Sequence, residues 1–134
     1  MNTEIPHDFS FGKAEKLCGK KAFDALFKHP FHFKKGVLKF FFVYPFPDEL
    51  AEAPVSFAFA VPKKIFKRAN KRNLLKRRMR EGVRLNKHIL TDIFAQKEGK
   101  IAIFIKYESA QIMDSALIHA LIVQAFEKIA KQVK

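Results

Sequence analysis

Residues 63–87 carry the feature that most restricts how this chain can fold: twelve lysines and arginines against a single acid, Glu81. They hold +11 of the formal net charge of +13. Like charges at helical spacing repel one another, so such a segment costs stability unless an anionic partner offsets the repulsion. Apolar residues nevertheless recur within it at helical intervals. The segment therefore predicts a folded, cationic binding surface on a scaffold that is otherwise nearly neutral.

Residues 70–90 divide into a cationic and an apolar face when they are placed on a helix at about 100° per residue. One face holds Asn73, Lys76, Arg77, Arg80, Arg84 and Lys87. The opposite half holds Leu74, Leu75, Met79, Leu85, Ile89 and Leu90, which suits packing on a sheet. Arg78 lies among these apolar residues, and we expect its long side chain to reach an edge. A solvated helix face normally mixes charges of both signs, so a strip without acids favours an anionic partner.

Phosphate suits this strip better than a membrane surface does. Membrane-surface helices expose large apolar side chains opposite their charge, whereas this helix needs its apolar side for the core. Arginine grips phosphate through paired hydrogen bonds. No run approaches the roughly 18 apolar residues of a membrane span, and the N-terminus lacks the pattern of a signal peptide. The single cysteine, Cys18, suits a reducing compartment. We expect a cytoplasmic protein with no membrane partner.

The rest of the chain reads as one α+β domain, residues 1–134, with a mixed sheet and helices packed on it. Residues 1–12 are expected to form an irregular arm. The predicted order is helix, strand, strand, helix, strand, helix. These elements are predicted at residues 14–28, 36–44, 55–61, 70–90, 101–105 and 109–131. A Pro-rich loop is predicted at 45–54, and Ser109 or Asp114 is expected to cap the last helix.

A second candidate site lies on the strand 55–61, where one face carries only small residues. Ser56, Ala58 and Ala60 leave room for another molecule against the sheet. Phe23 and Phe27 on the first helix, with Lys39 and Phe41 on the neighbouring strand, are candidates to flank that space. A cationic groove with stacking rings is how single-stranded nucleic acid is held. The same phenylalanines also suit a hydrophobic core.

The chain offers little for chemistry of its own. Its acids are scattered, no glycine-rich phosphate loop occurs, and His29 and His32 have no further ligand beside them. A protein nuclease needs clustered carboxylates or a poised histidine pair. We therefore predict no catalytic residue and no metal site in this chain.

The sequence VSFAFAVPKK followed by KRANKRNLLKRRMRE resembles the bacterial ribonuclease P protein component. Lys63 and Lys64 match the family's lysine pair, and Arg72 and Asn73 begin its Arg-Asn-Arg core. Leu74 departs from the second arginine of that core. The basic residues beyond the core are matched by Lys76, Arg77 and Arg80. The resemblance covers roughly residues 14–131.

The resemblance implies a left-handed βαβ crossover and a role in removing the 5′ leader of precursor tRNA. The implied partners are the catalytic ribonuclease P RNA and the precursor tRNA, with Mg²⁺ held mainly by the RNA; no protein partner is expected. The expected RNA-binding residues are Lys63, Lys64, Arg68, Lys71, Arg72, Asn73, Lys76, Arg77, Arg80 and Arg84. The expected leader cleft comprises Phe23, Phe27, Lys39, Phe41, Ser56, Ala58 and Ala60. The alternatives are a structural or ribosomal RNA-binding protein with no processing role, and a protein-only nuclease.

Overall fold

A four-stranded sheet forms from segments rich in aromatic and β-branched residues, which favour extended backbone. The computed structural model describes residues 11–133, so most of the expected arm 1–12 lies outside the described residues. The strands are β1 (Phe31–Lys35), β2 (Leu38–Phe46), β3 (Val55–Ala60) and β4 (Lys100–Tyr107), in the order β1-β2-β4-β3. The β1–β2 and β2–β4 pairs are antiparallel and the β3–β4 pair is parallel. The mixed sheet predicted from the sequence is confirmed.

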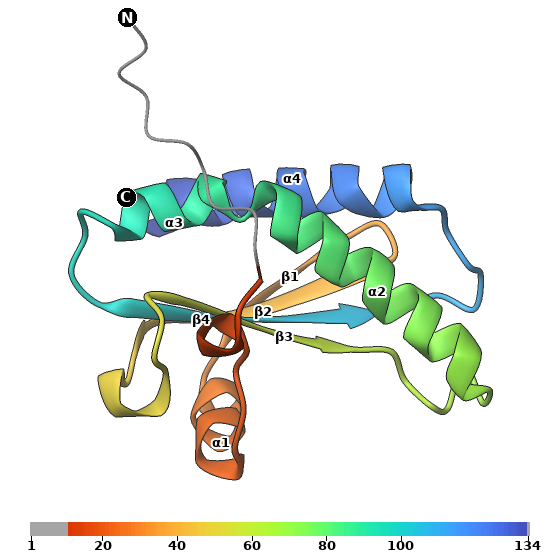
Figure 1. The fold of residues 1–134 in the computed structure, drawn as a ribbon, viewed down its shortest axis with the longest axis horizontal. Helices are drawn as coiled ribbons and strands as arrows, with labels where there is room; N and C mark the ends of the chain where they lie inside the picture. Colours follow the sequence, from red (N-terminus) through yellow and green to blue (C-terminus); the bar gives the residue numbers. More distant parts are fainter. Residues whose placement is uncertain (1–10, 134) are drawn as a thin grey trace, which may run out of the picture.

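Helices cover the two faces of this sheet unequally. The helices are α1 (Lys20–Lys28), α2 (Ala69–Asn86), α3 (His88–Phe94) and α4 (Ser115–Val133), with short 3₁₀ turns η1 (Lys13–Glu15) and η2 (Asp48–Leu50). The helices α2, α3 and α4 lie over one face, and α1 lies against the other (Figure 1). The parallel strands β3 and β4 are joined through α2 and α3. Because α1 is short, the second face of the sheet is less fully covered.

The main core lies between the sheet and the three helices on its first face. Leu75 and Met79 of α2 are fully buried there, as the apolar half of the basic segment predicts, and Val83 is buried with them. These three pack with sheet residues and with α4, including Phe40, Phe42, Phe57, Ile103, Ile105, Ile122 and Phe126. The prediction is wrong for Leu85, which is exposed. A smaller cluster under α1 contains Leu17, Ala22, Leu26, Phe46, Ala58 and Ala102. Burying one face of α2 fixes the opposite face toward solvent.

The structure contains one strand that the predicted order lacks. In β1, Phe31 and Phe33 stack on the β2 rings of Phe42 and Phe40, each with centroids 5.3 Å apart. His32 lies on the other face of this hairpin, paired with Phe41. The segment FHFKK therefore does alternate with the two-residue period of a strand, although it is too short to stand out from the sequence alone.

The predicted ends of three helices also differ from the observed ones. The first helix begins at Lys20 because Gly19, with φ of 96°, has a non-helical backbone conformation that interrupts any helix before it. The last helix begins at Ser115, and Asp114 caps it by accepting a hydrogen bond from the Leu117 N–H at 2.9 Å. The predicted helix 70–90 is interrupted at Lys87, which separates α2 from α3.

Candidate nucleic-acid interface

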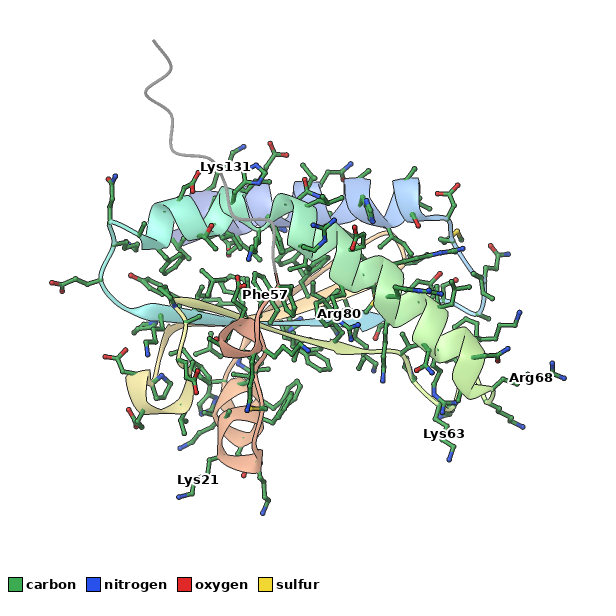
Figure 2. The ribbon with its side chains drawn as sticks, viewed as in Figure 1. Lys21, Phe57, Lys63, Arg68, Arg80 and Lys131 are labelled. Carbon is green, nitrogen blue, oxygen red and sulfur yellow. The ribbon has the colours of Figure 1, made fainter. Side chains whose placement is uncertain are left out.

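The solvent side of α2 gathers unpaired cations in its N-terminal half. Asn73, Lys76, Arg77 and Arg80 line one shallow pocket with Asn70 and Leu74. Lys63 and Arg68 lie beside the start of this helix, and Arg80 lies farther along it (Figure 2). We call the following residues the basic surface: Lys63, Lys64, Arg68, Lys71, Asn73, Lys76, Arg77 and Arg80. Leu74, at the position where the resemblance leads us to expect an arginine, lies inside this pocket.

No carboxylate of the described residues neutralises the basic surface. Within residues 11–133, none of its lysines or arginines forms an ion pair, whereas acids elsewhere in the chain do so with Lys34, Arg84, Lys87 and Lys106. Adjacent unpaired cations raise the free energy of the folded protein. They also concentrate anions beside the helix and speed the encounter with a polyanion. This arrangement is therefore suited to a phosphate backbone.

The predicted contact of Arg72 with RNA stays a prediction, and the structure shows that part of its guanidinium is engaged within the protein. Its Nη1 donates hydrogen bonds to the backbone oxygens of Phe66 and Lys67, at 2.7 and 2.8 Å. These bonds tie the helix to the turn that precedes it, where Phe66 enters the core. The half-buried Arg72 thus fixes the start of α2, and its neighbour Asn73 is the exposed member of the pair.

Arg84 is likewise engaged within the protein. Its Nε donates to Glu81 Oε2 at 3.0 Å, and its Nη2 bonds the other carboxylate oxygen. The hydrogen bond from Arg84 lowers the pKa of Glu81. The pair is therefore present at neutral pH and is lost only as the pH falls through that lowered pKa. The prediction that the cationic strip meets no acid is wrong at this position.

Lys87 was placed on the same strip but is buried, with only 4% of its surface exposed. Its Nζ lies 2.7 Å from both carboxylate oxygens of Glu15, which comes from the 3₁₀ turn η1. Glu15 also accepts a hydrogen bond from the Gly12 N–H. Lys87 thus anchors the N-terminal segment. Arg78, as expected, reaches an edge, where it donates to the Met113 oxygen before α4.

A cluster of phenylalanine rings occupies the less covered face of the sheet beside α1. The Phe27 ring lies 5.8 Å from that of Phe41 and 5.0 Å from that of Phe104, and Phe23 lies 6.5 Å from Phe104. Phe27 remains 45% exposed. We call Phe23, Phe27, Phe41 and Phe104 the aromatic cluster. Three of its members were predicted, and the structure brings those three together.

A row of lysines crosses the sheet next to the aromatic cluster. The strand register sets Lys34 opposite Lys39 and Lys39 opposite Lys106. The neighbouring row contains His32, Phe41 and Phe104. Like charges directly opposite each other destabilise a sheet. Among the residues that the structure describes, only Glu108 counters them, 3.9 Å from Lys34 and 3.6 Å from Lys106. We call Lys34, Lys39 and Lys106 the lysine row.

The small-residue face of β3 is only partly available to a ligand. Ser56 is 1% exposed, and its Oγ has no hydrogen-bond partner among the described residues. Ala58 is also buried, in the cluster beneath α1, and only Ala60 is partly exposed. Ser56 is therefore removed from the expected leader cleft, because the protein's own side chains cover it.

Sequence reasoning missed Phe104, Lys106 and Lys34. The run IAIFI, 101–105, contains only apolar residues, which conceals that Phe104 and Lys106 share the α1 side of β4. Extending the strand to residue 107 would have placed them in the same alternation as Phe41 and Lys39. Lys34 required the unpredicted strand β1.

The described residues contain no group of three or more histidine, cysteine, aspartate or glutamate side chains that is placed to hold a metal ion. None of their helices is long and apolar enough to cross a membrane.

The Ribonuclease P family model matches residues 11–130. A ribonuclease P protein component from Porphyromonas gingivalis is 31% identical over 134 residues, covering 96% of this chain and 92% of that protein. One from Chlorobaculum tepidum is 42% identical over 89 residues, covering 66% of this chain and 58% of that protein. The structure of the Staphylococcus aureus RNase P protein has the same fold, with a TM-score of 0.62, 19% identity, and coverage of 89% of this chain and 97% of that one.

Proposed function

Since the chain belongs to the ribonuclease P protein family, we propose that its basic surface binds the RNA subunit and that its aromatic cluster and lysine row bind the single-stranded 5′ leader of precursor tRNA. The protein is a component of the ribonuclease P holoenzyme, a ribonucleoprotein that processes tRNA. The observation that carries the proposed contact with the RNA subunit is the acid-free cationic half of α2. We propose that the holoenzyme acts in the cytoplasm.

The basic surface suits the RNA subunit because it is broad, fixed and charged. Leu75, Met79 and Val83 hold the opposite side of α2 in the core, so its cations keep one orientation. Each phosphate that such cations neutralise releases counterions, which makes binding favourable and dependent on salt. Contacts of this kind position an RNA without reading its sequence.

The aromatic cluster and lysine row suit a single strand because rings and cations lie in adjacent rows. Base–aromatic stacking contributes about 1–3 kcal/mol per base and tolerates any sequence. Strands lie about 4.8 Å apart, so the lysine row presents three ammonium groups across three neighbouring strands. A leader crossing the strands can place its bases over Phe27, Phe41 and Phe104 and its phosphates along the lysine row.

Catalysis is proposed to reside in the RNA subunit, with Mg²⁺ supplying electrostatic stabilisation at the scissile phosphate. The protein's part is to hold the leader and to neutralise phosphates near the junction of leader and RNA subunit. Binding energy gained on the leader, away from the scissile bond, helps to hold the precursor in its productive position. The same neutralisation reduces the Mg²⁺ concentration that the folded RNA and bound precursor require.

A reconstitution experiment tests this proposal. Purified protein is mixed with a bacterial ribonuclease P RNA at low Mg²⁺, and cleavage of precursor tRNA is measured; we expect the protein to restore cleavage. The Phe27→Ala variant should restore it too but should bind a precursor with a leader about tenfold more weakly, with unchanged affinity for leaderless tRNA. No rescue by the wild type would favour a purely structural RNA-binding role. Cleavage by the protein without RNA would instead identify a protein nuclease.

A further inference from the structure

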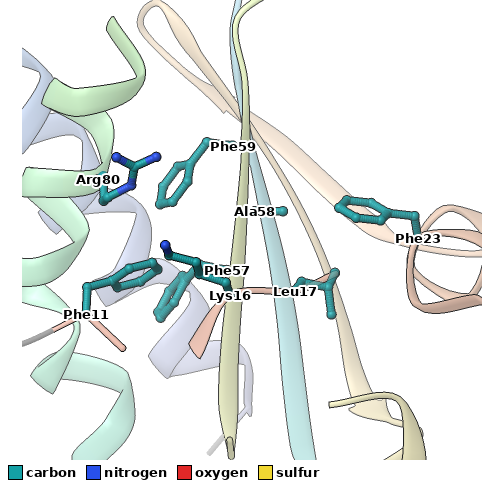
Figure 3. Close-up of a pocket in the computed structure, with 8 residues that line it drawn as sticks. All are labelled: Phe11, Lys16, Leu17, Phe23, Phe57, Ala58, Phe59 and Arg80. Atoms are coloured by element: carbon teal, nitrogen blue, oxygen red, sulfur yellow. The ribbon is translucent and has the colours of Figure 1, made fainter. Parts of the chain in front are cut away.

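A small pocket of about 190 Å³ opens at the free edge of β3, between the basic surface and the aromatic cluster. Arg80 of α2 and Phe59 lie on one side of the strand, and Phe23 of α1 lies on the other (Figure 3). Lys16, in the segment just before α1, reaches the same pocket. We call it the edge pocket. It is smaller than the roughly 300–1,000 Å³ sites of drug-sized ligands, a size that suits one flat ring.

The walls of the edge pocket are aromatic and cationic. Phe11 packs against both Phe57 and Phe59, with centroids 6.0 Å apart in each case. Phe57 is 1% exposed and holds this wall in place, while Phe11 and Phe59 remain partly exposed. Among residues 11–133, the only charged side chains that line the pocket are Lys16 and Arg80, and neither forms an ion pair with another of these residues.

The backbone of β3 contributes a further recognition element. The strand pairs with β4 along one side only, and on the other side the Leu17 N–H donates to the Phe57 oxygen at 2.9 Å. Backbone groups of a strand alternate between its two edges, so Phe59 presents its N–H and C=O to the same free edge as Phe57. No backbone bond outside the ladders engages Phe59 within residues 11–133. An unpaired donor and acceptor at one residue can bond the edge of a base.

We propose that the edge pocket binds one unstacked nucleotide of single-stranded RNA. Its phosphate lies between Lys16 and Arg80, its base packs against the rings of Phe59 and Phe11, and the base edge bonds the backbone of Phe59. This inference rests on the proposed function, which supplies the RNA. The nucleotide comes either from an unpaired position of the RNA subunit or from the leader, and the same chemistry serves both sources.

The sharing of one phosphate by two cations from distant segments makes the proposal testable by a double-mutant cycle. The variants are Lys16→Gln, Arg80→Gln and the double variant, with Lys13→Gln as a control of equal charge change outside the pocket. Affinity is measured in two arms: the protein for the isolated RNA subunit, and the holoenzyme for precursors with and without a leader. Thermal midpoints check that the variants fold.

We expect Lys16→Gln to weaken binding about fivefold in one arm, while Lys13→Gln changes it less than twofold. Because both cations hold one phosphate, the double variant should lose less than the product of the single losses, by roughly threefold or more. The arm that shows this coupling identifies the source of the nucleotide. If the losses of binding free energy are additive, or if Lys16→Gln loses no affinity in either arm, the proposal that the edge pocket binds a nucleotide is wrong. Failure of the wild-type protein to bind or activate the RNA subunit would instead overturn the proposed function.

Discussion

Arg80 and Lys87 lie seven residues apart on the helical face that the sequence predicts to be cationic, yet the structure gives them opposite surroundings. Arg80 is exposed and lines two pockets in which no described residue is an acid. Lys87 is buried against Glu15, a residue 72 positions away in the chain. The comparison shows that helical spacing predicts the side of the helix on which a cation lies, but not whether the cation is available to bind RNA. That availability depends on whether the fold brings an acid of the protein beside the cation.

The packing of α2 explains why its two halves differ. Gly82 lies where α2 meets α4, and an added Cβ there would approach Ile122 Cδ1 to 2.7 Å and His119 Cδ2 to 2.9 Å. The C-terminal end of α2 therefore lies close to α4, whereas its N-terminal end extends away from it (Figure 1). Near the close contact, Arg84 and Lys87 are engaged by Glu81 and Glu15. Toward the far end, Arg72 bonds the preceding turn, whereas Arg77 and Arg80 are exposed to solvent.

The largest expected effect comes from neutralising the N-terminal half. The triple variant Lys76→Gln, Arg77→Gln, Arg80→Gln should weaken binding to the RNA subunit by about two orders of magnitude at low salt. The plot of log affinity against log salt concentration should become less steep, with the magnitude of its negative slope smaller by about two to three. The thermal midpoint should stay the same or rise, because mutual repulsion is removed.

The matched control is Lys13→Gln, Lys28→Gln, Lys131→Gln, which removes the same charge from exposed positions elsewhere. Binding and its dependence on salt are measured for both triple variants. An equal loss for the two would show that net charge alone, and not the basic surface, holds the RNA.

The next largest effect is on stability and comes from Lys87. The Lys87→Met variant leaves the largely buried Glu15 carboxylate without its ammonium partner and should lower the free energy of unfolding by about 3 kcal/mol. Denaturant unfolding measures the loss. The affinity for RNA below the unfolding transition should change little, because Lys87 does not reach solvent.

Adding Glu15→Gln to Lys87→Met should recover much of that stability. The glutamine removes the stranded charge and keeps an acceptor for the Gly12 N–H. A Lys87→Met variant that unfolds like the wild type but loses RNA affinity would reverse the assignment and make Lys87 part of the interface.

The smallest effect should be a gain of affinity. Glu81→Gln removes the single acid of residues 63–87, so the net positive charge of the cationic face rises by one. We expect RNA to bind about two- to fivefold more tightly, the size of one additional exposed ion pair. Stability should change little because the Glu81–Arg84 pair is exposed to solvent. The gain should disappear in high salt, and its absence at low salt would mean that the RNA ends before Arg84.

Several features of this protein follow from the sequence by itself. The apolar period of residues 70–90 predicts a helix with a buried and a cationic face, and the buried positions of Leu75, Met79 and Leu90 confirm it. The alternation of residues 55–61 predicts β3, and the motif around Lys63 and Asn73 predicts the family. These are local properties, because side-chain direction along a helix or strand depends only on spacing.

Other features were decided by the tertiary structure. The Lys87–Glu15 pair, the lysine row and the edge pocket all join segments that are distant along the chain. Arg72 matches the family's binding motif, but its side chain donates to the carbonyl oxygens of Phe66 and Lys67. Ser56 lies on a small-residue face that α1 and the segment before it cover. Spacing fixes the direction of a side chain relative to its own helix or strand. The neighbours of that side chain are determined by the tertiary structure. Which cations are available for binding and which are engaged within the protein could therefore be decided only from the fold.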